Sequence, residues 1–281
     1  MSVLENVGRP ARVSRFRPRA VLTRVLNPRY ASVPPAFLRK PVRILDAGCG
    51  PQGALIARRL LASCWFEGID IADLPPGSPE RRAFDRYHQV DLDQTDLSFV
   101  PDAGFDYVIC SHTIEHLEDG IALVARLCAK VRPGGRLYLE WPSVESQTFP
   151  LRGFGLNFFD DGAHKQTFPL ETVAAVVAEN GLVIEYAGRR RQVARMLLAP
   201  VLAAWHCLRA TRVILYDFWD ILGSCYVVRA TRPLPRGDPV ATQVGPRLAA
   251  APSGDRNPSG ASTSPVSAPT AATMGTQGRR R

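Results

Sequence analysis

Residues 42–53 read V-R-I-L-D-A-G-C-G-P-Q-G, and this stretch guides the interpretation of the rest of the chain. Its apolar start predicts a buried strand, and the glycines that follow predict a tight turn. Residues 54–61 then have the composition of a helix. Glycine lets a chain reverse and lets a ligand lie against bare backbone, while a helix start offers free N–H groups. The stretch therefore predicts a site for a nucleotide-like cofactor.

The net charge of +9 comes from the two ends of the chain. Residues 1–43 carry ten basic residues against one acid, and residues 232–281 carry seven against two. The central residues 44–231 hold 18 basic and 23 acidic side chains, a net charge of −5. A basic face is therefore not predicted on the central part, and we do not expect nucleic acid as a partner.

We expect one domain with a tail on each side. Residues 1–38 predict a basic N-terminal arm, residues 39–231 the folded domain, and residues 232–281, rich in Ser, Pro, Ala, Gly and Thr, a disordered tail. The six cysteines are scattered without a C-x-x-C pair, so neither disulfides nor a metal site are expected. These cysteines and the lack of a signal-peptide pattern predict a cytoplasmic protein.

Strand and helix patterns alternate along the central part. Six further apolar runs have strand character: residues 64–71, 87–92, 105–110, 136–140, 182–186 and 224–230. Helical spacing of apolar residues appears at 121–131 and 169–181. Such alternation requires right-handed parallel crossovers, so we expect an α/β fold with a doubly wound sheet. Ligands of such sheets bind beyond the carboxyl ends of the strands, where several acids are found here.

Residues 189–219 interrupt the alternation before the last strand. Their arginines flank an apolar run at residues 196–204 that is far shorter than the roughly 20 residues of a membrane span, and Pro200 would bend it. We expect a helical insertion that packs on the domain or at a dimer interface. The alternative is peripheral contact with a membrane through residues 189–212. The sequence does not fix the oligomeric state.

Two cofactors are compatible with the glycine spacing. Gly48, Gly50 and Gly53 fit the G-x-G-x-x-G pattern of NAD-binding folds. Asp46 stands two residues before Gly48, where we expect its carboxylate to face the ligand, repelling a pyrophosphate and attracting an ammonium or sulfonium group. Pro51 removes an N–H that a phosphate would need. Both residues favour S-adenosylmethionine.

These motifs resemble the class I S-adenosylmethionine-dependent methyltransferases, of type 11 or 23. The resemblance rests on I-L-D-A-G-C-G-P-Q-G, G-I-D-I, an acid-ended third strand, F-D-Y-V-I-C-S-H-T-I-E-H-L and R-P-G-G-R-L, in family order over residues 42–140. It implies a Rossmann-like seven-stranded sheet with the last strand antiparallel. It also implies a set of cofactor-binding residues: Asp46, Gly48, Cys49, Gly50, Asp70, Ile71, Asp91, Leu92 and Ser111. In this set Asp70 would bind the ribose hydroxyls.

The acceptor side is predicted from the long connection at residues 141–165, which is placed to cover the ligand crevice. Its segment N-F-F-D-D-G-A-H resembles a substrate-side loop of methyltransferases in polysaccharide and glycolipid synthesis, which implies that Asp160, Asp161 and His164 contact the acceptor. His116 follows the fourth strand and is expected near the transferable methyl group. His116 and His164 are the candidate catalytic bases for a hydroxyl acceptor.

The sequence thus predicts a methyltransferase that acts on a small-molecule, sugar-linked or lipid-linked acceptor by O- or N-methylation. A nicotinamide oxidoreductase and a non-catalytic cofactor-binding protein remain as alternatives. RNA methylation is disfavoured, because S-H-T-I follows the fourth strand where a base-binding N-P-P-Y would be expected. We expect a cytoplasmic location, with membrane association as an open alternative.

Overall fold

The computed structural model describes residues 26–61, 63–150, 156–209 and 218–235. Residues 1–25 of the predicted N-terminal arm and residues 236–281 of the predicted tail lie outside the described residues. The same holds for residues 151–155 of the long connection and for residues 210–217 of the insertion.

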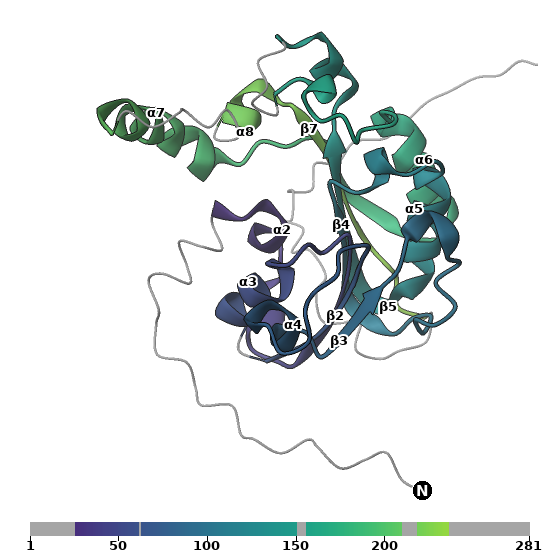
Figure 1. Ribbon diagram of the computed structural model, residues 1–281. Coiled ribbons are helices and arrows are strands. Elements are labelled where there is room, and N and C mark those ends of the chain that lie inside the picture. Colours follow the sequence, from purple (N-terminus) through teal and green to yellow (C-terminus); the bar gives the residue numbers. More distant parts are fainter. Residues whose placement is uncertain (1–25, 62, 151–155, 210–217, 236–281) are drawn as a thin grey trace, which may run out of the picture. The chain divides into compact units, whose positions relative to one another are not determined.

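A seven-stranded sheet forms the centre of the fold (Figure 1). Its strands are β1 (Val42–Ala47), β2 (Cys64–Asp70), β3 (Arg86–Gln89), β4 (Phe105–Ser111), β5 (Val131–Pro142), β6 (Val183–Arg189) and β7 (Cys225–Thr231). Their order across the sheet is β3-β2-β1-β4-β5-β7-β6, and β7 runs antiparallel to both of its neighbours. The strand order reverses between β1 and β4, the point at which such sheets bind ligands. The predicted fold class, including the antiparallel last strand, is confirmed.

Helices cover both faces of the sheet (Figure 1). One face carries α2 (Pro28–Ala31), α3 (Gly53–Leu60) and α4 (Pro79–Ala83), and the other carries α5 (Gly120–Lys130) and α6 (Leu170–Glu179). Short 3-10 turns are η1 (Pro35–Leu38), η2 (Leu92–Gln94), η3 (Ile114–His116), η4 (Val144–Thr148) and η5 (Phe158–Asp160). Side chains of β1 alternate between two cores, with Ile44 toward α3 and Leu45 toward α5. Burial on both faces is what a parallel sheet requires.

Residues 27–38 belong to the domain, which corrects the predicted boundary at residue 39. Tyr30 and Phe37 are buried in the core under α3, and the Tyr30 hydroxyl donates to the Gly53 carbonyl at 3.4 Å. The Tyr107 hydroxyl of β4 donates to the Arg29 carbonyl at 2.5 Å. The arginine-rich composition concealed these apolar anchors, because their partners lie far along the chain.

The insertion between β6 and β7 is helical, as predicted. It contains α7 (Val193–Leu208), with Pro200 inside the helix, and α8 (Trp219–Leu222). Because β6 runs parallel to β5, the insertion leaves the sheet at the edge where the parallel strands end. None of the helices within the described residues is both long and apolar enough to cross a membrane.

Candidate functional site

A cleft of about 360 Å³ opens at the carboxyl ends of β1, β2 and β4. Six of the nine predicted cofactor-binding residues line it: Gly48, Gly50, Asp70, Ile71, Asp91 and Leu92. The predicted catalytic residue His116 lines it as well. The volume lies in the range of small-molecule sites. The strand ends therefore bring most of the predicted cofactor residues together.

The two glycines of the turn after β1 have different structural roles. Both have positive φ, +71° at Gly48 and +59° at Gly50, a region that favours glycine. A Cβ placed on Gly48 would come within 2.0 Å of the Thr113 hydroxyl oxygen, whereas one placed on Gly50 would meet nothing within 4 Å. Gly48 thus makes room for Thr113, and Gly50 leaves bare backbone open to the cleft.

Asp70 links the end of β2 to the glycine turn. One carboxylate oxygen accepts from the Gly50 N–H at 2.8 Å, and the other accepts from the Ala72 N–H at 3.0 Å. A carboxylate has about four acceptor sites, so Asp70 retains capacity for ligand hydroxyls. Asp91 caps η2 by accepting from the Asp93 N–H at 3.0 Å, and it also lines the cleft. Its role as a cap therefore does not remove it from the cofactor site.

Asp46 does not face the cleft, which corrects the predicted orientation of its carboxylate. Strand alternation places it on the face of the sheet covered by α2 and α3, where it is fully buried and lies 3.4 Å from the Arg29 guanidinium. Burial raises the pKa of Asp46 to about 6, although Arg29 opposes the shift. Its Oδ1 has no hydrogen-bond partner among the described residues. Asp46 therefore links β1 to the Arg29 segment beneath the turn and does not contact a ligand in the cleft.

Cys49 and Ser111 are also absent from the cleft lining. Cys49 is buried in the core beside Phe84, and burial raises the pKa of its thiol. Ser111 is buried at the end of β4, and the next residue, His112, adopts a left-handed conformation with φ +55°. That turn brings Thr113, in place of Ser111, to the cleft wall.

A second cavity of about 190 Å³ adjoins the cleft. Its apolar lining comes from Pro142, Leu156, Phe158 and Trp219, and its polar lining includes His112, His116, Asp161 and His164. His112 and His116 line both spaces, so the turn after β4 forms the wall between them. Two of the three predicted acceptor residues, Asp161 and His164, lie on the side of the second cavity.

Asp160, the third predicted acceptor residue, has a structural role instead. Its Oδ2 accepts from the backbone N–H groups of Leu156 and Asn157, both at 3.1 Å, and completes a capping box on η5. The residue is absent from the lining of the second cavity. A capping box satisfies free N–H groups at a helix start, so this carboxylate shapes the loop around the acceptor side.

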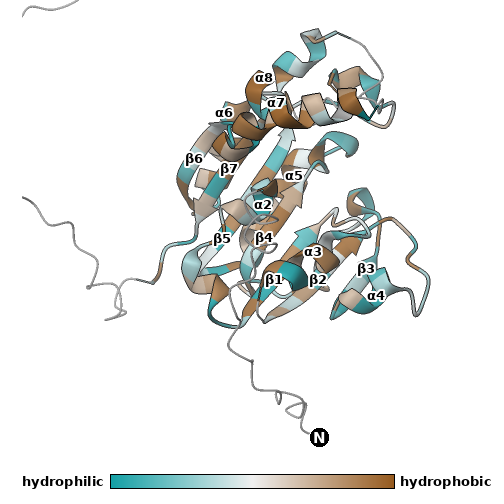
Figure 2. Ribbon diagram, turned by 90° about the vertical axis from the view of Figure 1, so that its left-hand side faces the viewer, coloured by the Kyte–Doolittle hydropathy of each residue, from teal (hydrophilic) through white to brown (hydrophobic). Residues whose placement is uncertain are grey.

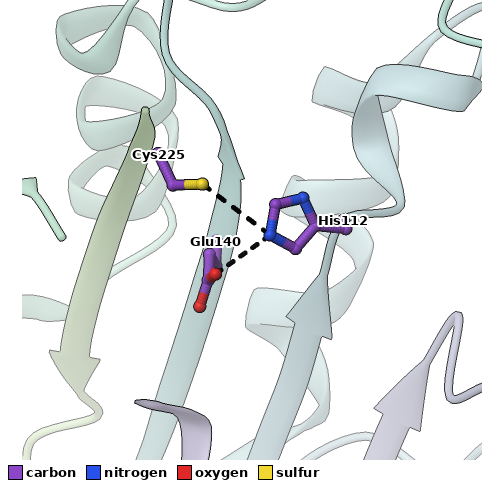
Figure 3. A group of neighbouring side chains, drawn as sticks. All are labelled: His112, Glu140 and Cys225. Atoms are coloured by element: carbon purple, nitrogen blue, oxygen red, sulfur yellow. Dashed lines mark hydrogen bonds and ion pairs between the residues drawn. The ribbon is translucent and has the colours of Figure 1, made fainter. Parts of the chain in front are cut away.

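His112 is held in a buried charged network that the sequence did not reveal (Figure 3). Its Nε2 lies 2.9 Å from Glu140 Oε1 and 3.9 Å from Cys225 Sγ, and its Nδ1 lies 3.2 Å from Glu115 Oε1. Burial alone would lower the pKa of His112, but Cys225, Glu115 and Glu140 outweigh it and raise the pKa well above the ordinary value. Because both ring nitrogens are engaged, His112 is not available as a general base.

The network continues into the insertion. Arg190 Nη1 donates to Glu140 Oε1 at 2.5 Å, and its other nitrogens bind both oxygens of Asp220 at 3.0 and 3.1 Å. Arg195 of α7 also binds Asp220, at 3.0 Å. Burial would raise the pKa of Glu140, but Arg190, His112 and Tyr138 hold it well below the ordinary value. This fork geometry of Arg190 fixes the insertion against the end of β5.

Comparison with known proteins places the chain in a family. A model of the family described as methyltransferase domain matches residues 14–187. The chain belongs to this methyltransferase-domain family. A solved structure, an S-adenosylmethionine-dependent methyltransferase from Mesorhizobium loti, has the same fold, with a TM-score of 0.51 at 19% identity over 73% of this chain and 95% of that chain.

Curated relatives of this methyltransferase domain include ubiquinone biosynthesis O-methyltransferases from several bacteria. The one from Methylobacterium nodulans is 26% identical over 68% of this chain and 73% of its own length. The one from Aeromonas salmonicida is 31% identical over 35% of this chain and 42% of its own length, so the chain spans less than half of that relative. The family uses S-adenosylmethionine. The predicted cofactor and the predicted class, an S-adenosylmethionine-dependent methyltransferase domain, are therefore confirmed.

Proposed function

We propose that the protein methylates a hydroxyl group of an apolar small molecule or lipid-linked acceptor. The observation that carries this proposal is the wall formed by His112 and His116 between two adjoining spaces. The cofactor cleft lies on one side of the wall, and a cavity lined partly by apolar side chains lies on the other. A methyl donor and an apolar acceptor held in these spaces would meet at the wall.

The residues of the cleft fit S-adenosylmethionine. The carboxylates of Asp70 and Asp91 can accept from ribose hydroxyls, Ile71 and Leu92 offer apolar surface for a base, and Gly50 leaves backbone exposed. The buried Asp46 is paired with the Arg29 guanidinium at 3.4 Å, so the negative charge at the cleft comes from Asp70 and Asp91, and it favours a cationic ligand. When bound, this cofactor supplies an electrophilic methyl group.

Transfer to a hydroxyl requires the acceptor to lose a proton. His116 and His164 both line the second cavity, and their rings pack together with centroids 4.8 Å apart. The Nδ1 atoms of the two rings lie within hydrogen-bonding distance of backbone carbonyls, of Ala163 and Phe158 respectively. A carbonyl only accepts, so Nδ1 carries the hydrogen in each neutral ring and Nε2 keeps its lone pair. These nitrogens are the groups positioned to handle the acceptor proton.

The relatives support an oxygen acceptor. The two enzymes named above act as O-methyltransferases in ubiquinone biosynthesis, and a 27-O-demethylrifamycin SV methyltransferase from Amycolatopsis mediterranei is 31% identical over 41% of this chain and 43% of its own length. We extend from these names only the acceptor class, a hydroxyl on a largely apolar molecule.

Incorporation of label from methyl-labelled S-adenosylmethionine tests this proposal. The purified protein is incubated with a cell extract, which is then partitioned between organic solvent and water. We expect label in the organic phase as a base-stable product, and none with the Asp70→Ala variant, which removes a cleft carboxylate. Label confined to water-soluble products, or to base-labile esters, would exclude an apolar hydroxyl acceptor.

We also propose that α7 contacts an anionic lipid surface, the peripheral membrane contact expected for residues 189–212. Five apolar side chains at helical spacing are between 51% and 86% exposed: Val193, Leu197, Val201, Trp205 and Leu208. Figure 2 shows apolar residues along much of this helix. Exposed arginines stand at either end, Arg191 and Arg209, and residues 188–216 contain no acid. This charge favours anionic lipid over a second copy of α7, which would bring like charges together.

Vesicle flotation tests the lipid contact. The protein is expected to float with vesicles that contain phosphatidylserine and to remain unbound with neutral phosphatidylcholine. A Leu197→Asp/Val201→Asp variant should lose flotation without loss of fold, because both side chains are largely exposed. The contrary outcome is that the wild-type protein stays in the bottom fraction with both kinds of vesicle and sediments as a dimer in analytical ultracentrifugation, while the variant sediments as a monomer. The exposed face would then be a dimer interface, and the lipid proposal would be wrong.

A further inference from the structure

His116 and His164 approach each other because two segments far apart in sequence are held side by side. The Glu115 carbonyl accepts from the N–H groups of Lys165 and Gln166 at 2.8 and 3.3 Å, which aligns η3 with the loop after η5. His116 comes from the first segment and His164 from the second. Phe158 stacks on the His164 ring with centroids 4.6 Å apart, which limits rotation of that ring.

Both rings are oriented as metal-binding histidines are. His164 Nδ1 lies 2.6 Å from the Phe158 carbonyl, and His116 Nδ1 lies 3.2 Å from the Ala163 carbonyl. Histidines that bind metals donate their second ring N–H to a carbonyl or carboxylate, which leaves the other nitrogen for the ion. Here the nitrogen left for a ligand is Nε2 of each ring, and that of His164 lies 3.8 Å from Asp161 Oδ2, beyond hydrogen-bonding distance.

Glu115 supplies an independent sign of a missing ligand. Its side chain is fully buried, and its Oε1 is held by His112 Nδ1 at 3.2 Å. Its Oε2 is buried and has no hydrogen-bond partner among the described residues. A buried carboxylate oxygen without a partner is unfavourable, so it is normally satisfied by a donor or a cation.

We propose that Glu115, His116 and His164 bind a divalent transition-metal ion at the wall between the two cavities. One ligand atom from each residue lies within 4.8 Å of the others. Ligands about 2.0–2.2 Å from a common ion in tetrahedral geometry are separated by about 3.3–3.6 Å, so side-chain movements that close the ligand separations by roughly 1 Å would complete the site. Two imidazoles and one carboxylate suit a transition metal better than Ca²⁺, and three ligands leave positions open for an acceptor oxygen.

The neighbouring cluster of His112, Glu140 and Cys225 is not a comparable site (Figure 3). The Arg190 guanidinium already lies 2.5 Å from Glu140 Oε1, so this carboxylate has a cationic partner. Both nitrogens of His112 are engaged by carboxylates. This cluster instead orients Glu115 through His112, as residues around a metal ligand do.

With the ion bound, Nε2 of His116 and of His164 are ligands and no longer bases, so the ion takes over the removal of the acceptor proton; this part rests on the proposed function. A hydroxyl oxygen bound to a divalent cation becomes more acidic and releases its proton to water. The oxygen lone pair then forms the bond to the methyl carbon as the carbon–sulfur bond breaks, which yields an ether and S-adenosylhomocysteine. Metal binding itself does not depend on the acceptor.

Binding of Mn²⁺ to the full-length protein, after treatment with a chelator, tests the site directly. The electron paramagnetic resonance signal of free Mn²⁺ is lost on binding, so titration gives stoichiometry and affinity. We expect one ion per chain, with affinity lowered about tenfold or more in Glu115→Gln and in His164→Gln. The matched control is His88→Gln, which removes a histidine that contacts another buried glutamate, Glu67, at 2.8 Å. Affinity should be unchanged in this control.

Three outcomes overturn the proposal: the wild-type protein binds no ion, His88→Gln weakens binding as much as His164→Gln, or Cys225→Ser abolishes binding while His164→Gln does not. Each variant is first shown to bind S-adenosylhomocysteine, which establishes that it is folded. If Mn²⁺ binds as expected but no apolar hydroxyl is methylated, the metal site stands and the proposed acceptor class is wrong.

Discussion

Replacing Gly48 with alanine separates the two roles of the glycine turn. A non-glycine residue in the left-handed region costs roughly 1–2 kcal/mol. The new Cβ would also lie 2.0 Å from Thr113 Oγ1, 2.7 Å from Thr113 Cγ2 and 2.8 Å from Thr113 Cβ, so Thr113 must move. Overpacking of this kind costs about 1–3 kcal/mol. The free energy of unfolding should therefore fall by about 2–5 kcal/mol in Gly48→Ala.

Gly50→Ala is the matched control. Its φ of +59° imposes similar strain, but its Cβ meets nothing within 4 Å. The loss of stability should therefore be limited to roughly 1–2 kcal/mol. Because Gly50 lines the cleft, its added methyl group should still weaken binding of S-adenosylhomocysteine. One variant is thus expected to affect mainly folding, and the other mainly the ligand.

Urea denaturation and calorimetry measure the two effects. Adding Thr113→Ala to Gly48→Ala should recover part of the lost stability, because it removes the two contacts made by Oγ1 and Cγ2. The coupling energy of such neighbouring residues is about 0.5–3 kcal/mol. Equal destabilisation by Gly48→Ala and Gly50→Ala, or a coupling energy of zero, would refute the role assigned to Thr113.

Three further changes test other parts of the structure. The pKa of Asp46, about 6, lies above that of a free aspartate, so protonation of Asp46 stabilises the folded state below about pH 4, and this stabilisation is lost as the pH rises through 6. The loss amounts to about 3 kcal/mol of the free energy of unfolding. Denaturation measured from pH 4 to pH 7 should show this decrease in the wild-type protein and not in Asp46→Asn. Arg190→Met removes the guanidinium that joins Glu140 to Asp220, leaving Glu140 with His112 and Asp220 with Arg195, and should lower the free energy of unfolding by about 3–5 kcal/mol. Arg136→Met breaks the more exposed pair with Glu185 and should change it by less than about 1 kcal/mol in the same denaturation assay. Asp160→Ala removes the cap of η5 and should lower the free energy of unfolding by about 1 kcal/mol. Asp161 has a half-exposed carboxylate, so Asp161→Ala should leave the free energy of unfolding nearly unchanged and should raise the KM for the acceptor.

Local patterns in the sequence were sufficient to predict the sheet and most of the cofactor cleft. Strand periodicity and the glycine turn depend on neighbouring residues, and both were predicted correctly. The orientation of Asp46 was predicted wrongly, because strand alternation points its carboxylate toward Arg29, a residue that precedes the first strand. The same limit applies to Tyr30, whose buried position depends on contacts with α3.

The acceptor side depended more on long-range contacts. The left-handed conformation of His112 places Thr113, and not Ser111, at the cleft wall. No local sequence pattern predicts a left-handed conformation at this histidine. The carboxylate of Asp160 accepts hydrogen bonds from the backbone of its own loop, whereas the sequence resemblance implied that it contacts the acceptor. No pattern in the sequence points to Glu115, because its carboxylate comes near His164 only where η3 meets the loop that carries that histidine.

The position of β7 determines the order in which the sheet can be completed. β6 is made before β7 but, within the part of the chain that the structure describes, pairs only with β7, since β7 lies between it and β5. During synthesis β6 therefore has no place in the sheet until the insertion and β7 have followed it, and β5 remains an open edge until then. A chain interrupted within the insertion would expose that edge, which is a template for association with other strands. Completion of the last strand is thus the step that closes the fold and protects it from aggregation.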